Sequence, residues 1–221
     1  YKATLEEVLK KGNIKVHYSA NTIGINGDNK TIEFETKNTE FVKQSLSKSA
    51  AACYSIAEGN DTDSVSRVTM NFDLCHSVPP QSAPDFIKNS PLRDQANALG
   101  YVEIDKNTMQ HSRFPNVFAL GDCTNAPCSK TGAAIRKQAP VVVTNLLEVM
   151  DKKALTANYD GYSACPIPTQ YGKLMLAEFD YSNKPKMTFP FDQAKPRWTM
   201  WILKTKILPW LYWNKILKGT A

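Results

Sequence analysis

The stretch from Phe114 to Asp122 constrains the fold most, because it joins a short apolar run to a glycine and a carboxylate. Val117 to Leu120 are four apolar residues in succession, as in a buried parallel strand. Gly121 lets the backbone leave such a strand sharply, which puts Asp122 at the carboxyl end of the strand. Ligands of open α/β sheets bind at this end, where a carboxylate can hold sugar-like hydroxyl groups. An ordinary turn after a strand is the alternative interpretation.

A predicted helix over residues 131–150 follows this turn and opens with small residues. The order strand, Gly-Asp, helix resembles the second flavin-contacting signature of flavoproteins that have two dinucleotide-binding domains. That resemblance implies that Gly121, Asp122 and Thr131 bind FAD. Lys130 stands just before the helix, where a cation would stabilise the negative charge of a reduced flavin. A solvated loop lysine is the alternative for Lys130.

Further motifs follow one another along the chain: Leu74 to Pro80, Gly121 to Asn125, Ser129 to Thr131, Asp160 to Pro166, Leu176 to Phe179 and Pro209 to Asn214. In this order they resemble the C-terminal half of the eukaryotic-type sulfide:quinone oxidoreductases. The family belongs to the flavin disulfide reductase superfamily. The resemblance implies an FAD enzyme that oxidises sulfide, passes electrons to a membrane quinone and gives sulfane sulfur to an acceptor. It also implies a peripheral position on the mitochondrial inner membrane.

Charge and cysteine content exclude some classes of function. The chain has 27 Lys and Arg against 21 Asp and Glu, a net charge of +6 that suits an anionic membrane surface or a nucleotide cofactor. Nucleic acid is disfavoured as a partner, since no basic helix with interleaved aromatic residues and no zinc-knuckle spacing occurs. The odd number of five cysteines argues against a secreted disulfide framework. Cys123 and Cys128 have no second Cys/His pair, so we expect no metal site.

The chain contains no Gly-x-Gly-x-x-Gly fingerprint, the loop that binds the pyrophosphate in dinucleotide-binding folds. The family carries this loop near its own N-terminus. We therefore expect the chain to lack the first half of the enzyme, and with it a second redox cysteine and any targeting segment. By itself the chain should be inactive.

We expect an α/β fold, part of a two-dinucleotide-binding-domain flavoprotein, with four regions. These are 1–75, the end of the second dinucleotide-type α/β domain; 76–150, the C-terminal part of the FAD-binding domain; 151–195, a compact terminal domain with the redox cysteine; and 196–221, an amphipathic membrane-facing tail. Periodicity predicts helices over 1–11 and 94–99, strands over 14–18, 22–25, 31–36, 68–75, 101–104 and 174–179, and a polar surface excursion over 38–66.

Cys165 is the candidate catalytic residue. Pro166 biases it towards an extended conformation, and such a loop can project a thiol into solvent. A thiolate attacks sulfur, and exchange with a second cysteine resolves the product. The resemblance implies that Cys165 is one of the two redox cysteines of the family. A buried inert thiol is the alternative, as we expect for Cys75, whereas Cys53 falls in the polar excursion.

Residues 196–219 contain all four tryptophans of the chain, and lysines and Pro209 interrupt their apolar runs. A membrane-spanning helix needs about 20 predominantly apolar residues, so this segment does not qualify. Two short amphipathic helices separated at Pro209 suit a membrane interface better. A helix pair packed on its own domain is the alternative.

Two other functions remain open. A type II NADH:quinone oxidoreductase would share the Gly-Asp strand and the membrane tail, but its chemistry needs no redox cysteine. A non-catalytic peripheral membrane domain could keep a vestigial flavin site. Cys165 distinguishes the first alternative, and flavin binding distinguishes the second.

Overall fold

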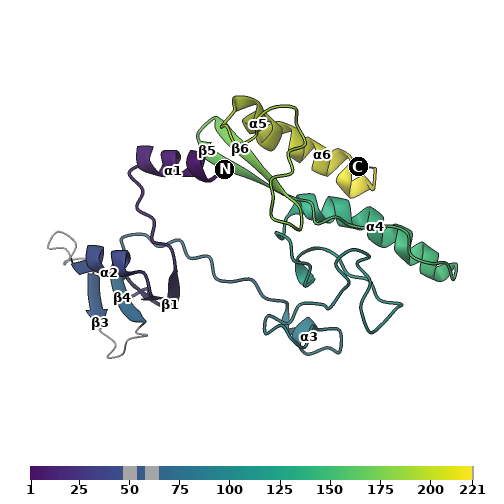
Figure 1. Cartoon of the computed structure of the whole chain (residues 1–221), viewed down its shortest axis with the longest axis horizontal. Coiled ribbons are helices and arrows are strands. Elements are labelled where there is room, and N and C mark those ends of the chain that lie inside the picture. Colours follow the sequence, from purple (N-terminus) through teal and green to yellow (C-terminus); the bar gives the residue numbers. More distant parts are fainter. Residues whose placement is uncertain (47–53, 58–64, 221) are drawn as a thin grey trace. The chain divides into compact units, whose positions relative to one another are not determined.

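The computed structural model describes residues 1–46, 54–57 and 65–220 of a mixed α/β chain (Figure 1). The chain divides into two compact units, one formed by Leu9–Pro79 and the other by Tyr1–Val8 together with Pro80–Ala221. Helix α1 (Lys2–Lys11), predicted from its apolar spacing, begins in one unit and ends in the other.

The unit formed by Leu9–Pro79 is built on an antiparallel sheet with strand order β1-β2-β4-β3. Its elements are β1 (Ala20–Asn26), β2 (Thr31–Thr36), α2 (Thr39–Leu46), β3 (Tyr54–Ala57) and β4 (Ser66–Asn71). The predicted strands over 22–25 and 31–36 are confirmed, and the turn between them spans Gly27 to Lys30. Phe41 and Val68 are buried in this unit, and the Phe41 ring meets that of Phe34 edge-on.

Three predictions for this unit are wrong. Residues 14–18 form no strand, because no neighbouring strand pairs with them in the described part of the chain and their apolar side chains are exposed. The predicted polar excursion over 38–66 contains α2 and β3, and its residues 47–53, with Cys53, and 58–64 lie outside the described residues. The strand predicted over 68–75 ends at Asn71, and the Leu74 side chain is 91% exposed.

The larger unit combines helices with a two-stranded hairpin. Its regular elements are α3 (Asp85–Lys88), a 3₁₀ turn (Gly121–Cys123), α4 (Gly132–Met150), β5 (Ser163–Gln170), β6 (Lys173–Phe179), α5 (Trp198–Ile202), a π-helical turn (Leu203–Ile207), α6 (Leu208–Asn214) and a second 3₁₀ turn (Ile216–Lys218). Strands β5 and β6 pair antiparallel, which confirms the strand predicted over 174–179.

The segment around the Gly-Asp turn is irregular, contrary to prediction. Val117 to Leu120 form no strand; Phe118 makes a single antiparallel bridge to Gln110. Residues 101–104 likewise contain only bridges of Val102, and residues 94–99 form turns instead of a helix. A strand needs a hydrogen-bonded neighbour along its length as well as apolar side chains. Here buried side chains such as Tyr101, Val102 and Met109 hold the segment in place.

Helix α4 confirms the helix predicted over 131–150. Thr131 caps it, because its side-chain oxygen accepts a hydrogen bond from the backbone N–H of Ala134 at 3.2 Å. The buried face carries two polar residues, Gln138 and Asn145, at positions where the apolar period would place hydrophobic ones. Both amides are hydrogen-bonded inside the unit, so the helix is attached to specific loops as well as to the core.

The C-terminal helices run on continuously from α5 through the π-helical turn into α6 (Figure 1). The predicted break at Pro209 is wrong. Pro209 lies in the first turn of α6, where a missing backbone N–H is tolerated, and the wider π-helical turn precedes it. The regular helix ends at Asn214 instead.

Candidate functional site

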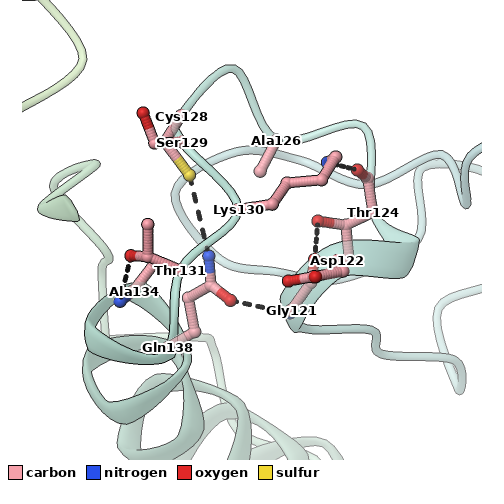
Figure 2. Close-up of a pocket in the computed structure, with 10 residues that line it drawn as sticks. All are labelled: Gly121, Asp122, Thr124, Ala126, Cys128, Ser129, Lys130, Thr131, Ala134 and Gln138. Carbon is pink, nitrogen blue, oxygen red and sulfur yellow. Dashed lines mark hydrogen bonds between the residues drawn. The ribbon is translucent and has the colours of Figure 1, made fainter. Parts of the chain in front are cut away.

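The Gly-Asp turn is fixed by its backbone. Gly121 has a φ of +77°, which favours glycine, and a Cβ there would approach the Ile135 side chain to 3.3 Å. Its N–H donates to Oε1 of Gln138 on α4 at 2.7 Å, and its carbonyl accepts from Oγ1 of Thr124 at 3.0 Å (Figure 2). These contacts leave Asp122 at the tip of the 3₁₀ turn, with an exposed side chain.

The four residues that the sequence predicts as a flavin site line one pocket that opens to solvent (Figure 2). The lining residues come from the segment 121–131 and the first turns of α4: Gly121, Asp122, Thr124, Ala126, Cys128, Ser129, Lys130, Thr131, Ala134 and Gln138. The pocket therefore lies at the N-terminal end of α4, where backbone N–H groups lack intrahelical acceptors. Anionic groups of a ligand are favoured at such a position.

The carboxylate of Asp122 is the acidic group of this pocket. In the described part of the chain it makes no hydrogen bond, so both of its oxygens are available to hydroxyl groups of a ligand. The N–H groups of Gly132 and Ala133 also have no partner within the helix, since Thr131 satisfies only that of Ala134. The pocket thus holds an acceptor for hydroxyl groups, and the unpaired N–H groups of the helix follow its lining residue Thr131 directly in the sequence.

Lys130 is not a freely solvated side chain. Its Nζ donates to the carbonyl of Thr124 at 2.7 Å and lies 4.1 Å from the centre of the Tyr101 ring. Burial lowers the pKa of this ammonium, while the nearby Cys128, Asp122 and Cys123 groups act in the opposite direction.

Two thiols lie in the same loop. Sγ of Cys123 donates to the Leu120 carbonyl at 3.3 Å, and burial raises the pKa of this thiol. Sγ of Cys128 accepts from Oη of Tyr159 at 3.6 Å and from Nε2 of Gln138 at 3.9 Å. The sequence analysis missed Gln138, although an amide at a core position of a helix could have indicated it. No group of three His, Cys, Asp or Glu side chains in the described ranges is arranged to hold a metal ion.

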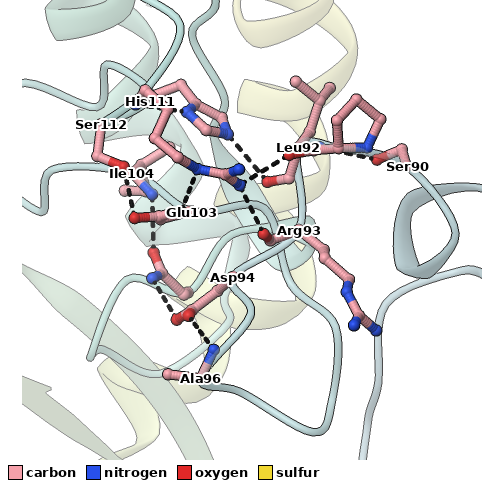
Figure 3. Close-up of polar contacts among 12 residues, drawn as sticks. Ser90, Leu92, Arg93, Asp94, Ala96, Glu103, Ile104, His111 and Ser112 are labelled. Atoms are coloured by element: carbon pink, nitrogen blue, oxygen red, sulfur yellow. Dashed lines mark hydrogen bonds and ion pairs between the residues drawn. The ribbon is translucent and has the colours of Figure 1, made fainter.

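A polar network holds the segment that follows the Asp122 turn (Figure 3). The Asn125 side chain accepts from the N–H of Ile104 at 3.1 Å and donates to Asp94 at 2.9 Å. Nearby, Ser112 and Arg113 both donate to Glu103, and these interactions lower the pKa of that carboxyl, the Ser112 hydrogen bond most. Hydrogen bonds to neighbouring segments therefore fix the chain after the turn, although no strand precedes the turn.

Cys165 lies in a strand and not in the predicted loop, but its thiol is exposed as expected. It faces Ala177 across the β5–β6 hairpin. A proline next to it is compatible with the strand because a two-stranded sheet has two free edges. Nζ of Lys204 lies 3.5 Å from the carbonyl oxygen of Pro166. Cys165 is not among the residues that line the pocket of Asp122.

A buried carboxylate, also missed by the sequence analysis, lies on the neighbouring strand. Glu178 is 1% exposed and accepts hydrogen bonds from Tyr162, from the N–H and Oγ1 of Thr188, and from Nε2 of Gln193. Glu178 pairs with Ala164, the residue before Cys165. This cluster ties the segment 188–193 to the hairpin that carries the candidate thiol.

Curated relatives match nearly all of the chain, although no protein-family model matches it. The mitochondrial sulfide:quinone oxidoreductases of Mus musculus and Dictyostelium discoideum are 36% and 38% identical to it over 219 residues, 99% of this chain. The enzyme of the same name from Schizosaccharomyces pombe is 48% identical over 148 residues, or 65% of the chain. The matched regions are 43%, 42% and 32% of these relatives, so the chain spans less than half of their length.

A solved structure of low sequence identity shares the fold of this chain, and the likeness supports nothing beyond the fold. A chain of the Tetrahymena thermophila mitochondrial ATP synthase cryo-EM structure superposes with a TM-score of 0.68 at 22% identity, covering 95% of this chain and 44% of that one. The three curated relatives share one name, and two of them align with the chain almost from end to end. The resemblance of this chain to part of the mitochondrial sulfide:quinone oxidoreductases is thereby confirmed.

Proposed function

We propose that the pocket at the Gly121–Asp122 turn holds part of an FAD molecule. Asp122 would accept hydrogen bonds from flavin hydroxyl groups, and the N-terminus of α4 would favour an anionic part of the cofactor. The free carboxylate of Asp122 beside this helix N-terminus is the observation that carries the proposal. The lining residues come from one turn and the start of one helix, so they would bind only a portion of the cofactor.

We further propose that the protein contributes to the oxidation of sulfide with a quinone as the electron acceptor. The names of the three relatives support this activity. The exposed thiol of Cys165 would supply one of the two cysteine sulfurs that this oxidation requires. FAD, when bound, would accept the two electrons that are released when the cysteine pair returns to its disulfide.

The role of Cys165 in this proposal is thiol–disulfide exchange. Hydrosulfide attacks one sulfur of a disulfide between Cys165 and a second cysteine. We place this second cysteine in the part of the enzyme that the chain does not match. The S–S bond breaks, one cysteine keeps the incoming sulfur as a persulfide, and the other leaves as a thiolate. Transfer of the sulfane sulfur to an acceptor then frees both thiols for reoxidation. The exposure of Cys165 on β5 supports access of both sulfide and acceptor.

The C-terminal helices suggest how a lipid-soluble quinone is reached. In the described part of the chain no helix is long and apolar enough to cross a membrane. Met200 of α5 is buried, whereas Trp210 and Trp213 of α6 are 56% and 65% exposed. Aromatic residues flanked by lysines are typical of interfacial segments. We therefore propose peripheral association with the mitochondrial inner membrane, in keeping with the mitochondrial relatives.

A chimera tests the proposed activity, because the chain spans less than half of its relatives. The chain replaces the matching 219 residues of the mouse enzyme, and flavin absorbance and quinone reduction are measured with sulfide or NADH as the donor. We expect bound flavin, sulfide-driven turnover, and weaker but still measurable flavin binding in Asp122→Asn. Turnover with NADH alone would favour a type II NADH:quinone oxidoreductase. A folded chimera without flavin would favour a non-catalytic membrane domain.

A further inference from the structure

One of the residues of the loop between Asp122 and α4 closes that loop with its own side chain. Nζ of Lys130 donates to the backbone carbonyl of Thr124 at 2.7 Å, which closes the chain from Thr124 to Lys130 into a ring (Figure 2). Thr124 is fully buried. Its backbone N–H and its Oγ1 both donate to the carbonyl of Gly121, at 3.3 Å and 3.0 Å. The hydrogen bond from Lys130 to Thr124 is therefore connected, through Thr124 and Gly121, to the turn that contains Asp122.

The same ammonium also contacts a second segment. It lies 4.1 Å from the centre of the Tyr101 ring, and Oη of Tyr101 donates to the carbonyl of Gln81 at 2.8 Å. The next residue, Val102, donates its N–H to the carbonyl of Cys123 at 2.8 Å. Lys130 thus lies where the Asp122 turn meets the segment 101–102. The charge of the Lys130 ammonium is stabilised by the carbonyl of Thr124 and by the face of the Tyr101 ring. The side chain is half-buried, and both interactions are stronger there than in water.

We propose that Lys130 is a positioning residue: it holds the Gly121–Thr124 turn closed and thereby fixes Asp122 for the ligand, instead of contacting the ligand itself. The identity of the ligand as FAD rests on the function proposed above. The closure of the loop does not, because it depends only on contacts within this chain.

Thiol labelling of the chain measures this closure without any flavin. Cys123 and Cys128 lie in the loop and are half-buried, while Cys165 is exposed and serves as an internal reference. Lys130→Met should speed alkylation of the two loop thiols at least tenfold, since it removes a hydrogen bond donated by a charged group. Lys130→Arg should restore slow labelling. Lys106→Met is the matched control, because Lys106 lies over the ring of Tyr181 but outside the loop.

Unchanged labelling of Cys123 and Cys128 in Lys130→Met would overturn the proposal. Equal acceleration at Cys165 would overturn it too, since the effect would then be a general loss of structure. Should Lys130→Met not fold, the pair Tyr101→Leu and Tyr101→Phe decides. Only the leucine, which removes the ring face, should speed labelling of the loop thiols. Equal rates in these two variants would count against the closure.

Flavin affinity in the chimera tests the link to Asp122. Lys130→Met should weaken FAD binding, and this loss should vanish in the Asp122→Asn background, because Lys130 acts through the turn. Additive losses in the double variant, or a shifted flavin reduction potential in Lys130→Met, would indicate direct contact with the cofactor and overturn the positioning role. Absence of any flavin would count against the proposed function alone, since thiol labelling reports the closure independently.

Discussion

Gln138 of α4 and Gly121 of the Asp122 turn are joined by a hydrogen bond in which the backbone N–H of Gly121 donates to Oε1 of Gln138 at 2.7 Å. The other end of the same amide lies 3.9 Å from Sγ of Cys128. One buried side chain thus connects the helix, the turn and the loop that together line the pocket. The position of Asp122 relative to the start of α4 depends on this residue.

Gln138→Leu should destabilise the protein because it removes the acceptor of a backbone N–H at the pocket. An unsatisfied buried donor costs about 1–3 kcal/mol, measurable by denaturant unfolding. The exposed neighbour Lys137 provides the control, since Lys137→Leu alters the same helix turn without touching Gly121. Equal unfolding free energies for the two variants would mean that the amide has no structural part in the turn.

Glu178→Gln should be more disruptive than its small change in shape suggests. The buried carboxylate accepts from Tyr162, Thr188 and Gln193, and an amide would direct N–H groups at some of these donors. We expect a loss of at least about 2 kcal/mol in unfolding free energy, because hydrogen bonds to a charged group are the stronger ones. The same change at Glu148, which accepts from Thr156 near the surface, should cost clearly less. A thermal melt unchanged by Glu178→Gln would contradict this account.

Three tyrosines should make the protein sensitive to alkali. Burial raises the pKa of Tyr159, Tyr162 and Tyr181, and in Tyr162 the hydrogen bond to Glu178 adds to the effect. A raised pKa favours the neutral phenol in the folded state. This contribution is therefore complete below the unfolded value of about 10 and is lost as pH rises above it. Tyrosinate absorbance should show late ionisation that coincides with unfolding, and Tyr162→Phe should reduce the slope of stability against pH.

Cys165→Ser should separate cofactor binding from sulfide chemistry. The hydroxyl nearly preserves the shape of the exposed thiol but cannot form a persulfide or a disulfide. In the chimera, flavin absorbance and thermal stability should stay as they are, while sulfide-driven quinone reduction should fall to background. Cys75→Ser, at a half-buried thiol in the other unit, is the control and should keep its turnover. Undiminished turnover of Cys165→Ser would exclude the two-cysteine mechanism.

Local signals in the sequence predict the start of α4 and the turn at Gly121 better than the strands around them. The small residues after Thr131 begin α4 as expected, and the structure adds that Thr131 caps the helix. Gly121 and Asp122 likewise form the predicted tight turn beside that helix. These features depend on a few adjacent residues, so local propensity is enough to predict them.

Features that depend on distant partners were not predictable in the same way. Val117 to Leu120 have the composition of a buried strand, but pairing decides whether a strand forms, and only Phe118 pairs. The hydrogen bonds of Gln138 and Glu178 join residues 17 and 10–16 positions apart, which periodicity does not reveal. Pro209 does not interrupt the helix, because the first turn of a helix tolerates a missing backbone N–H.

The two exposed tryptophans of α6 give the sharpest test of membrane association. Removing residues 196–221 would also remove Met200, which is buried beside the hairpin, so that deletion would confuse anchoring with folding. Trp210→Ser combined with Trp213→Ser leaves α5 in place. Each large apolar side chain contributes about 1.5–3 kcal/mol at full burial, so binding to vesicles containing anionic lipid should fall at least tenfold. Salt should weaken the remaining binding, since lysines flank the helix.

The control is Tyr171→Ser, at an aromatic residue that is 93% exposed on the β5–β6 turn. This variant should bind vesicles as the unchanged protein does. If the double tryptophan variant also bound normally, α6 would not be the membrane contact.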